Sequence, residues 1–361
     1  MNIEIVDSDT PSRLHQVDFD RLRFGVEFSD HMLSCRFENG AWQPARIVPY
    51  QDLRFAPSMV ALHYGQSVFE GMKAYYKDAG TVQLFRPLDH YRRLVNSCVR
   101  MSIPPPEEQT FMEGLKTLLM LDREWVPKTE GASLYIRPIV FGCDEMIIAK
   151  SSESFEFLIM TSPVGAYYGQ GAIKPLSLTT APEYVRAVVG GTGEAKTAGN
   201  YAASFKPASE VQKQGFAQVM WLDAIEKRYI EEVGTMNLFF KFRDRLATPS
   251  LTGSVLPGIT RRSVIELARE WGVEVSEERI DIDELFAAHG RGELEEVFGA
   301  GTAAVIAPID HVHHQGRSIR LQVEEMGPFA RRMYEQITGI QYGRIEDHYG
   351  WTVPVDTTVA V

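Results

Sequence analysis

The sequence is poor in cysteine. Cys35, Cys98 and Cys143 are three among 361 residues. Because they are odd in number and far apart, they suit free thiols in a reducing compartment better than a disulfide framework. The first ten residues include acidic side chains and no apolar core, which argues against a signal peptide, and no apolar run is long enough to span a bilayer. We therefore expect a cytoplasmic protein without a membrane partner.

Positive charge is also in short supply. Lysine and arginine number 37 against 48 aspartates and glutamates, which gives a formal net charge of -11. A bulk charge of this sign disfavours binding to nucleic acid or to an anionic membrane surface. Any anionic substrate therefore needs a locally positive site, and nucleic acid is not expected as a partner.

Internal repeats and low-complexity tracts are absent, and a composition of 44% hydrophobic and 24% charged residues is that of an ordinary globular protein. The length exceeds that of one typical core, so two domains are expected. Residues 165–176 are rich in glycine and tyrosine and suggest a linker. We predict a small α/β domain over residues 1–164, a linker over 165–176 and a large domain over 177–361, in an α/β (α+β) fold.

Hydrophobic periodicity indicates strands and helices in both halves. Asn39-Gly40 between two apolar stretches predicts a hairpin over residues 32–48, because Asn-Gly suits a turn with positive φ. Further strands are expected at residues 81–85, 134–142, 155–164, 217–222, 236–241 and 296–308. Helical spacing predicts helices at residues 91–101, 111–119, 260–271 and 329–338.

Lys196 is a candidate catalytic residue. It lies within the run GGTGEAKT at residues 190–197. The run is one residue away from a phosphate-binding P-loop, and residues 219–223 imitate the apolar strand and aspartate of a nucleotide hydrolase. However, Ala195 carries a Cβ where that loop needs glycine, and Glu194 would place a carboxylate beside the phosphate. Taken alone, Lys196 would be a solvated surface lysine.

The motifs elsewhere in the chain change that interpretation. They stand at residues 62–64 (LHY), 68–75 (VFEGMKAY), 84–87 (LFRP), 135–138 (YIRP), 199–201 (GNY), 232–237 (EVGTMN), 258–260 (GIT) and 298–303 (FGAGTA). Together they cover most of the chain, and they resemble the branched-chain aminotransferases, a branch of the fold-type-IV pyridoxal-phosphate enzymes. The pair EVGTMN and FEGMKA is specific to that family, whereas a lone lysine or glycine pair would be weak.

The resemblance implies a two-domain fold-type-IV fold with pyridoxal 5'-phosphate as cofactor. Lys196 would supply the primary amine that bonds the cofactor aldehyde and then moves a proton. Lys73, Lys174 and Lys206 lack the following Gly-Asn-Tyr. The further cofactor-binding residues that the resemblance implies are Arg93, Tyr201, Glu232, Ile259, Thr260 and Thr302.

Each of these residues has a physical reason for its role. A carboxylate at Glu232 would keep the cofactor's ring nitrogen protonated. Tyr201 would hydrogen-bond the phenolate oxygen. Arg93 and the amides of Ile259 and Thr260 would hold the phosphate, since a helix N-terminus offers unpaired N–H groups and a favourable dipole.

The resemblance places the substrate among Tyr64, Phe69, Tyr135, Arg137, Tyr167, Thr235 and Ala303. The aromatic members would form an apolar pocket, although each of them suits a plain core equally well. Arg137 is expected near the pocket mouth, where it would bind the distal carboxylate of glutamate, because burying an unpaired carboxylate is costly. The Ala303 amide would serve the substrate carboxylate together with Thr302.

Two charged neighbours have simpler interpretations. Glu231 would point to the opposite face of a strand from Glu232 and would face solvent. Arg92 would face away from Arg93 on a helix and would be a solvated charge.

Two further patterns bear on metal binding and redox control. His311, His313 and His314 fit a polar hairpin end before Gln315-Gly316 better than a metal site, since no second cluster completes a coordination shell. Eukaryotic members of the family carry Cys-x-x-Cys after the Gly-Thr-Ala, where this chain has Ala304 and Ala307, so thiol regulation of that kind is not expected.

The implied reaction is a ping-pong transamination that moves the amino group of leucine, isoleucine or valine to 2-oxoglutarate. Its partners are amino acids and 2-oxo acids, and the family implies a homodimer or a higher homo-oligomer. Within the fold, the alternatives are a D-amino-acid aminotransferase, an aminodeoxychorismate lyase and an aminotransferase for other substrates. The motif EVGTMN argues against the first two. A non-catalytic or nucleotide-binding protein is the alternative from another class.

Overall fold

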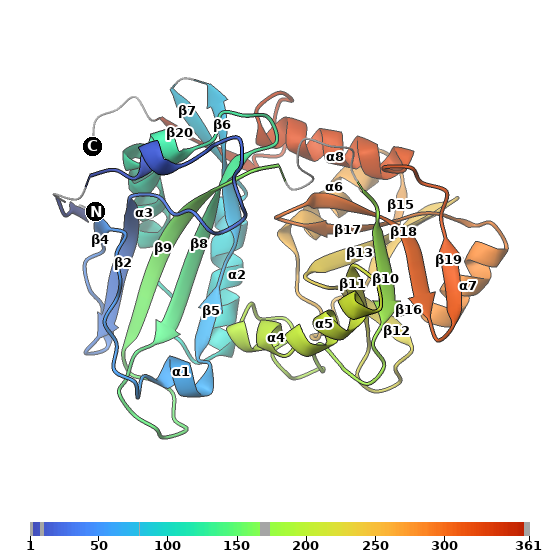
Figure 1. Ribbon diagram of the computed structural model, residues 1–361, viewed down its shortest axis with the longest axis horizontal. Coiled ribbons are helices and arrows are strands. Elements are labelled where there is room, and N and C mark those ends of the chain that lie inside the picture. Colours follow the sequence, from blue (N-terminus) through green and yellow to red (C-terminus); the bar gives the residue numbers. More distant parts are fainter. Residues whose placement is uncertain (1–2, 8–10, 79, 167–173, 357–361) are drawn as a thin grey trace. The chain divides into compact units, whose positions relative to one another are not determined.

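The computed structural model describes residues 3–7, 11–78, 80–166 and 174–356. The chain divides into two compact units. The first comprises Met1–Gly169, Ala195–Gly199 and Gly339–Val361, and the second comprises Gln170–Glu194 and Asn200–Thr338. Among the described residues, each unit contains one ten-stranded sheet (Figure 1).

The first sheet is antiparallel apart from the pairing of its first two strands. Its order is β1 (Glu4–Ile5), β4 (Arg46–Pro49), β2 (His31–Glu38), β9 (Phe155–Val164), β8 (Ser133–Gly142), β6 (Met72–Asp78), β7 (Thr81–Phe85) and β20 (Thr352–Asp356). In addition, β3 (Ala41–Trp42) pairs with β2, and β5 (Ser67–Phe69) pairs with β8. The expected hairpin is confirmed: Asn39 and Gly40 have φ of 53° and 78°, and Phe37 pairs with Trp42.

Two helices, α2 (Pro87–Arg100) and α3 (Glu108–Leu121), cover one face of this sheet (Figure 1). Their apolar stripes bury side chains against the strands, which is the main stabilising term for such a layer. Fully buried members of this core include Leu33, Leu94, Leu115, Ile136 and Phe157. The short helices of this unit are η1 (Leu14–Gln16), α1 (Val60–Tyr64) and η2 (Arg123–Trp125).

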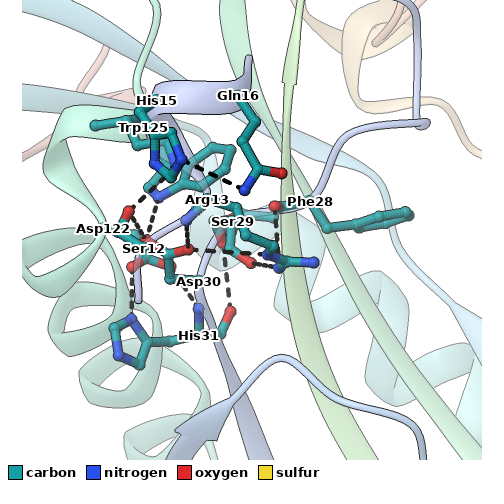
Figure 2. Close-up of polar contacts among 12 residues, drawn as sticks. Ser12, Arg13, His15, Gln16, Phe28, Ser29, Asp30, His31, Asp122 and Trp125 are labelled. Atoms are coloured by element: carbon teal, nitrogen blue, oxygen red, sulfur yellow. Dashed lines mark hydrogen bonds and ion pairs between the residues drawn. The ribbon is translucent and has the colours of Figure 1, made fainter. Parts of the chain in front are cut away.

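A polar network fastens the N-terminal segment to β2 (Figure 2). Asp30 accepts hydrogen bonds from the Arg13 amide at 3.0 Å and from Trp125 Nε1 at 2.9 Å. The neighbouring His31 places Nδ1 2.6 Å from Asp122 Oδ1. The segment before β2 is therefore held by side chains at the end of α3 and in η2.

The second sheet is mixed and partly closed. Its order is β15 (Glu274–Glu278), β14 (Arg245–Pro249), β13 (Met236–Phe242), β17 (Leu294–Gly301), β18 (Val305–His314), β10 (Leu176–Thr180), β11 (Gln218–Leu222), β12 (Tyr229–Val233) and β16 (Ile280–Asp281), and β19 (Arg317–Arg320) pairs with β18. Because β12 also pairs with β13, the strands from β13 through β18 and β10 to β12 form a closed ring.

The helices that begin in this second part of the fold are α5 (Phe205–Lys213), α6 (Ile259–Glu270), α7 (Ile282–Gly290) and α8 (Pro328–Gln341). The division into units assigns the last residues of α8, from Gly339, to the first unit, and likewise Ala198 and Gly199 of α4 (Ala198–Ala202). Among the described residues, no helix combines the length and the apolar character that crossing a bilayer requires.

The predicted strands and helices are confirmed, and the mixed α/β fold with them. The apolar region at residues 296–308 consists of two strands, β17 and β18, rather than one. The domain ranges stay a prediction, but one strand pairing departs from them. β20 lies within the predicted large domain and pairs with β7 of the first sheet, because it satisfies the hydrogen bonds of an edge strand that would otherwise be unpaired.

Candidate functional site

Lys196 lies in the short segment Ala195–Gly199 of the first unit. Its carbonyl accepts the N–H of Phe69 at 3.0 Å, and its own N–H donates to Ser97 Oγ on α2 at 2.9 Å. Thr197 Oγ1 donates to the carbonyl of Ser67 at 2.8 Å. Contacts from β5 and α2 therefore fix the backbone at Lys196, so that its side chain starts from a defined position.

The Lys196 amine is shifted toward its neutral form. Burial is the largest cause and the positive charge of Arg93 the second, and together they lower the pKa of Lys196 to about 8, against the opposing effect of Glu70. The amine lies 4.8 Å from the centroid of the Phe69 ring. A lysine with such a pKa keeps a neutral fraction near neutral pH and can attack a carbonyl.

Arg93 points inward from α2, whereas Arg92 is exposed and pairs with Asp89 at 3.3 Å, as predicted. The guanidinium of Arg93 donates from Nε and Nη2 to the two carboxylate oxygens of Glu70, at 2.7 and 2.9 Å. His90 Nδ1 lies 2.8 Å from Glu70 Oε2. This bidentate pair gives the guanidinium a fixed orientation beside Lys196.

The charge state of this cluster follows from its surroundings. Burial alone would raise the pKa of Glu70, but Arg93 and His90 hold it well below its usual range. Burial lowers the pKa of His90 against the effect of its bond to Glu70, so the imidazole is neutral near neutral pH. Glu70 was not predicted as a partner of Arg93, although it is the acidic residue within the motif VFEGMKAY.

Three predicted substrate residues come together in the first unit. Arg137 Nη2 donates to Tyr135 Oη at 2.9 Å, and its guanidinium carbon lies 4.5 Å from the Phe69 ring centroid. A Cβ at Gly71 would approach Tyr135 Oη to 2.1 Å, so glycine leaves room for the tyrosine. Arg137 Nε is buried and has no hydrogen-bond partner among the described residues, which leaves it able to donate to a bound anion.

Glu232 lies on β12 in the second unit and is 2% exposed. Its Oε1 accepts the amide of Leu256, and its Oε2 pairs with Arg186 Nε at 3.0 Å. Arg186 also donates to the carbonyl of Ser254 at 2.6 Å. Glu232 is thus a buried and oriented carboxylate, and its functional role stays a prediction. Its pairing with Arg186 was missed, because pairing across distant loops leaves no local pattern.

Glu231 was expected to face solvent, and this expectation is wrong. It is 7% exposed, and Ser254 Oγ donates to its Oε1. Burial raises the pKa of Glu231, although Ser254 and Arg186 act in the opposite direction. The alternation of faces along β12 is as predicted, but chain from other loops covers the second face as well.

Tyr201 and Thr235 are brought near Glu232 within the second unit. Tyr201 lies on α4, and Thr235 lies in the turn between β12 and β13. Together with Glu232 and Arg186 they line a small cavity of about 20 Å³. A phenol and a buried carboxylate thus share one concave surface.

The predicted anion-binding amides lie at the start of α6. Gly258 is its N-cap, and because glycine has no side chain, this residue does not cap the amides of the first turn. A Cβ on Gly258 would approach Asn237 Oδ1 to 2.0 Å, so glycine is needed there. Thr302 and Ala303 lie in the turn between β17 and β18.

The predicted aromatic residues of the substrate pocket differ in how far they are exposed. Tyr64 is 46% exposed at the C-terminal end of α1, unlike Phe69 and Tyr135, which are each 9% exposed. Tyr167 lies outside the described residues.

The three histidines lie on β18, which forms a hairpin with β19 as predicted. In the described part of the chain, no group of three or more His, Cys, Asp or Glu side chains is arranged to hold a metal ion.

Residues 67–312 match the amino-transferase class IV family. The chain belongs to the class IV aminotransferases. It is 49% identical over 335 residues to branched-chain-amino-acid transaminase 1 of Bacillus subtilis (strain 168), covering 92% of this chain and 94% of the relative.

Solved class IV aminotransferases share the fold. The branched-chain amino acid aminotransferase of Escherichia coli is 31% identical, with a TM-score of 0.72, over 90% of this chain and 98% of that one. The branched-chain amino acid aminotransferase of T.th., solved with pyridoxamine 5'-phosphate, is 29% identical, with a TM-score of 0.71, over 88% of this chain and 97% of that one. The expected fold-type-IV architecture of this class IV aminotransferase is thereby confirmed.

Proposed function

We propose that this class IV aminotransferase is a branched-chain-amino-acid transaminase that uses pyridoxal 5'-phosphate. The reaction moves the amino group of leucine, isoleucine or valine to 2-oxoglutarate and yields a branched 2-oxo acid and glutamate. The observation that carries the proposal is the Lys196 amine, whose pKa is lowered to about 8 beside Phe69, Arg93 and Glu70. The names of the relatives support the substrate class.

The residues present fit the proposed cofactor. An aldehyde needs a neutral amine, which Lys196 offers. A pyridine nitrogen needs a carboxylate, and Glu232 is buried and oriented by Leu256 and Arg186. A phosphate needs N–H donors, and α6 begins without a side-chain cap among the described residues.

We assign the binding roles accordingly. Glu232 would hold the ring nitrogen and Tyr201 the phenolate oxygen. The amides of Ile259 and Thr260 would hold the phosphate, together with Arg93 and Thr302. When bound, the cofactor supplies an electron sink that stabilises negative charge at the substrate Cα.

The chain's own residues then carry the proton and orient the substrate. The Lys196 amine would take the proton from the substrate Cα and deliver it to the cofactor's C4′, which requires a pKa near the working pH. Arg93 and Glu70 hold that amine in a fixed electrostatic environment.

The substrate pocket has to accept both an apolar chain and a second carboxylate. Phe69 and Tyr135 offer apolar surface, and the resemblance implies a substrate-binding role for Tyr64, Tyr167, Thr235 and Ala303 as well. Arg137 would bind the distal carboxylate of glutamate through its buried Nε, which has no partner among the described residues.

We also propose that the enzyme is a homodimer in a reducing cytoplasm. The first unit exposes large apolar side chains, including Leu53, Phe55, Leu62, Ile147 and Ile148, and such groups suit an interface. Cys35, Cys98 and Cys143 are free and buried. Light scattering of the purified enzyme should give twice the mass of one chain, and a monomer would contradict the proposal.

The decisive experiment replaces the amine. Lys196→Ala should abolish transamination of leucine, isoleucine and valine, whereas the matched change at the exposed Lys206, Lys206→Ala, should leave it intact. Borohydride reduction of the parent followed by peptide mapping should place the adduct on Lys196. An adduct on another lysine, or full activity in Lys196→Ala, would refute the assignment. D-alanine and chorismate-derived substrates in the same panel test the alternatives within the fold.

A further inference from the structure

A second, larger cavity lies within the second unit, with a volume of about 260 Å³. Val255 and Ile230, each 2% exposed, belong to its deeper wall, and Val189 and Ile225, which are 61% and 81% exposed, belong to its rim. Pockets for drug-sized ligands measure about 300–1,000 Å³. The cavity therefore suits a small molecule with an apolar body.

Glu231 lines this cavity and contributes a carboxylate to its wall. Ser254 Oγ donates to Oε1, but Oε2 is a buried atom without a hydrogen-bond partner among the described residues. An unpartnered buried carboxylate oxygen is destabilising, because it has lost water without gaining a donor. Burial accordingly raises the pKa of Glu231. A ligand that donates a hydrogen bond here would remove that cost.

The other charged groups that line the cavity have partners. Asp223 accepts backbone N–H groups on both oxygens, including those of Glu226 and Tyr229. Glu226 pairs with Arg279 at 2.7 Å. Glu278 pairs with Arg245 at 3.4 Å. The lining thus contains four carboxylates and the single guanidinium of Arg279. Because that guanidinium is already paired with Glu226, the binding of an anionic or zwitterionic ligand is disfavoured.

A bare metal ion is also disfavoured. The carboxylates of this cavity do not form a group of three that could hold a metal, a finding that covers the described residues. Much of the wall is apolar, from Val188 and Val189 to Val255, and apolar atoms offer a metal no ligands. The same atoms would gain from contact with an alkyl group.

We propose that this cavity binds a small aliphatic ammonium ion, with its N–H donating to Glu231 Oε2 and its alkyl group against the valines and Ile225. The pairing of one N–H with a carboxylate in a partly buried site is a charge-assisted hydrogen bond, which is stronger than a neutral one. The site is separate from the one proposed for the cofactor, because adjacent residues of β12 point to opposite faces and Glu232 faces the smaller cavity.

The test is calorimetric titration of the purified holoenzyme with N,N-dimethylisobutylamine. A tertiary amine is protonated at neutral pH and keeps one N–H, yet it cannot condense with an aldehyde, so reaction at Lys196 does not contribute. We expect binding of the amine and at least tenfold weaker binding of the neutral alcohol 3-methylbutan-1-ol. Equal binding of the two, or no binding of the amine, would overturn the proposal.

Variants locate the site. Glu231→Gln keeps the shape and should weaken amine binding at least tenfold, whereas Glu153→Gln, the same change at an exposed residue of the first unit, should leave it unchanged. If Glu231→Gln does not fold, Ile225→Lys is the deciding variant. It places a competing cation at the exposed rim of the cavity and should abolish binding of the amine. Unchanged binding in Glu231→Gln or in Ile225→Lys would refute the assignment. Lys196→Ala should bind the amine like the parent, so the result is independent of the proposed transamination.

Discussion

At the scale of single residues, the chemistry depends on the environment of Lys196 rather than on lysine itself. Its backbone is fixed by Phe69 and Ser97, and its amine is desolvated beside Arg93. A solvated lysine would be almost wholly protonated near neutral pH, because its ordinary pKa is about 10.4. The fold therefore supplies the reactivity that the residue type lacks.

With cofactor removed, Lys196 should react with an acylating reagent at lower pH than an exposed lysine. Its pKa is lowered to about 8, mainly by burial, so its neutral fraction rises earlier as pH increases. Lys150 is the control, because its bond to Glu153 raises its pKa. Mass spectrometry of labelled peptides across a pH series should give a midpoint near 8 for Lys196. A common midpoint for both lysines would contradict the proposed environment.

Glu70→Gln should destabilise the protein strongly. The substitution removes the carboxylate that receives two hydrogen bonds from buried Arg93, and breaking a buried ion pair from one side costs about 3–5 kcal/mol. Glu113→Gln, which breaks a half-buried pair with Lys116 on the surface of α3, should cost about 0–1 kcal/mol. Urea denaturation measures both. Similar small losses in the two variants would show that the Glu70 pair is not buried in solution.

Motifs single out Lys196 and Glu232 as candidate residues, and their functional roles stay predictions. Residue-level prediction failed where partners come from distant segments. Glu231 was misplaced, because strand periodicity gives the two faces of β12 but does not say that distant loops bury both. Arg186 and Glu70 were missed as partners, since an ion pair between remote segments leaves no spacing in the sequence.

At the scale of elements, β2 is joined to the C-terminal end of α3 through a titratable contact between His31 and Asp122 (Figure 2). The hydrogen bond to Asp122 raises the pKa of His31, against the effect of burial, and the charges of Asp122 and Asp30 act in the same direction as the hydrogen bond. A group whose pKa is raised on folding stabilises the fold most below its unfolded pKa of about 6.5, and the contribution is lost as pH rises through the folded pKa.

His31→Gln should therefore lower the free energy of unfolding more at mildly acidic pH than at alkaline pH. The measurement is urea denaturation of parent and variant at both pH values. His15→Gln, at an exposed histidine of η1, is the matched control and should show no such difference. A loss for His31→Gln that is independent of pH would mean that the contact with Asp122 carries no proton-linked stability.

Elements with strong local signals were predicted well. The hairpin over β2 and β3, the helix α6 and the strands β8 and β9 follow from turn chemistry and apolar runs. The closed ring in the second sheet and the pairing of β20 with β7 were not predictable, because each joins segments far apart in the chain. Long-range pairing is decided by packing, and no short sequence window contains it.

At the scale of the whole molecule, the net charge of -11 opposes the approach of 2-oxoglutarate. Salt screens this long-range repulsion, while a buried contact such as that proposed for Arg137 is screened much less. Raising the ionic strength to a physiological level should therefore increase kcat/KM for 2-oxoglutarate and leave that for zwitterionic leucine nearly constant. Steady-state kinetics at several salt concentrations test this, and a fall for 2-oxoglutarate would show that local attraction dominates.

The position of β20 has a consequence for how the protein is made. Along the chain, this strand follows the other strands of its sheet by a long interval, and it completes the edge of that sheet. While the ribosome is still synthesising the chain, β7 presents an open edge of the kind that recruits foreign strands. A truncated chain that lacks β20 would thus be prone to aggregation, even though every residue proposed for catalysis had already been translated.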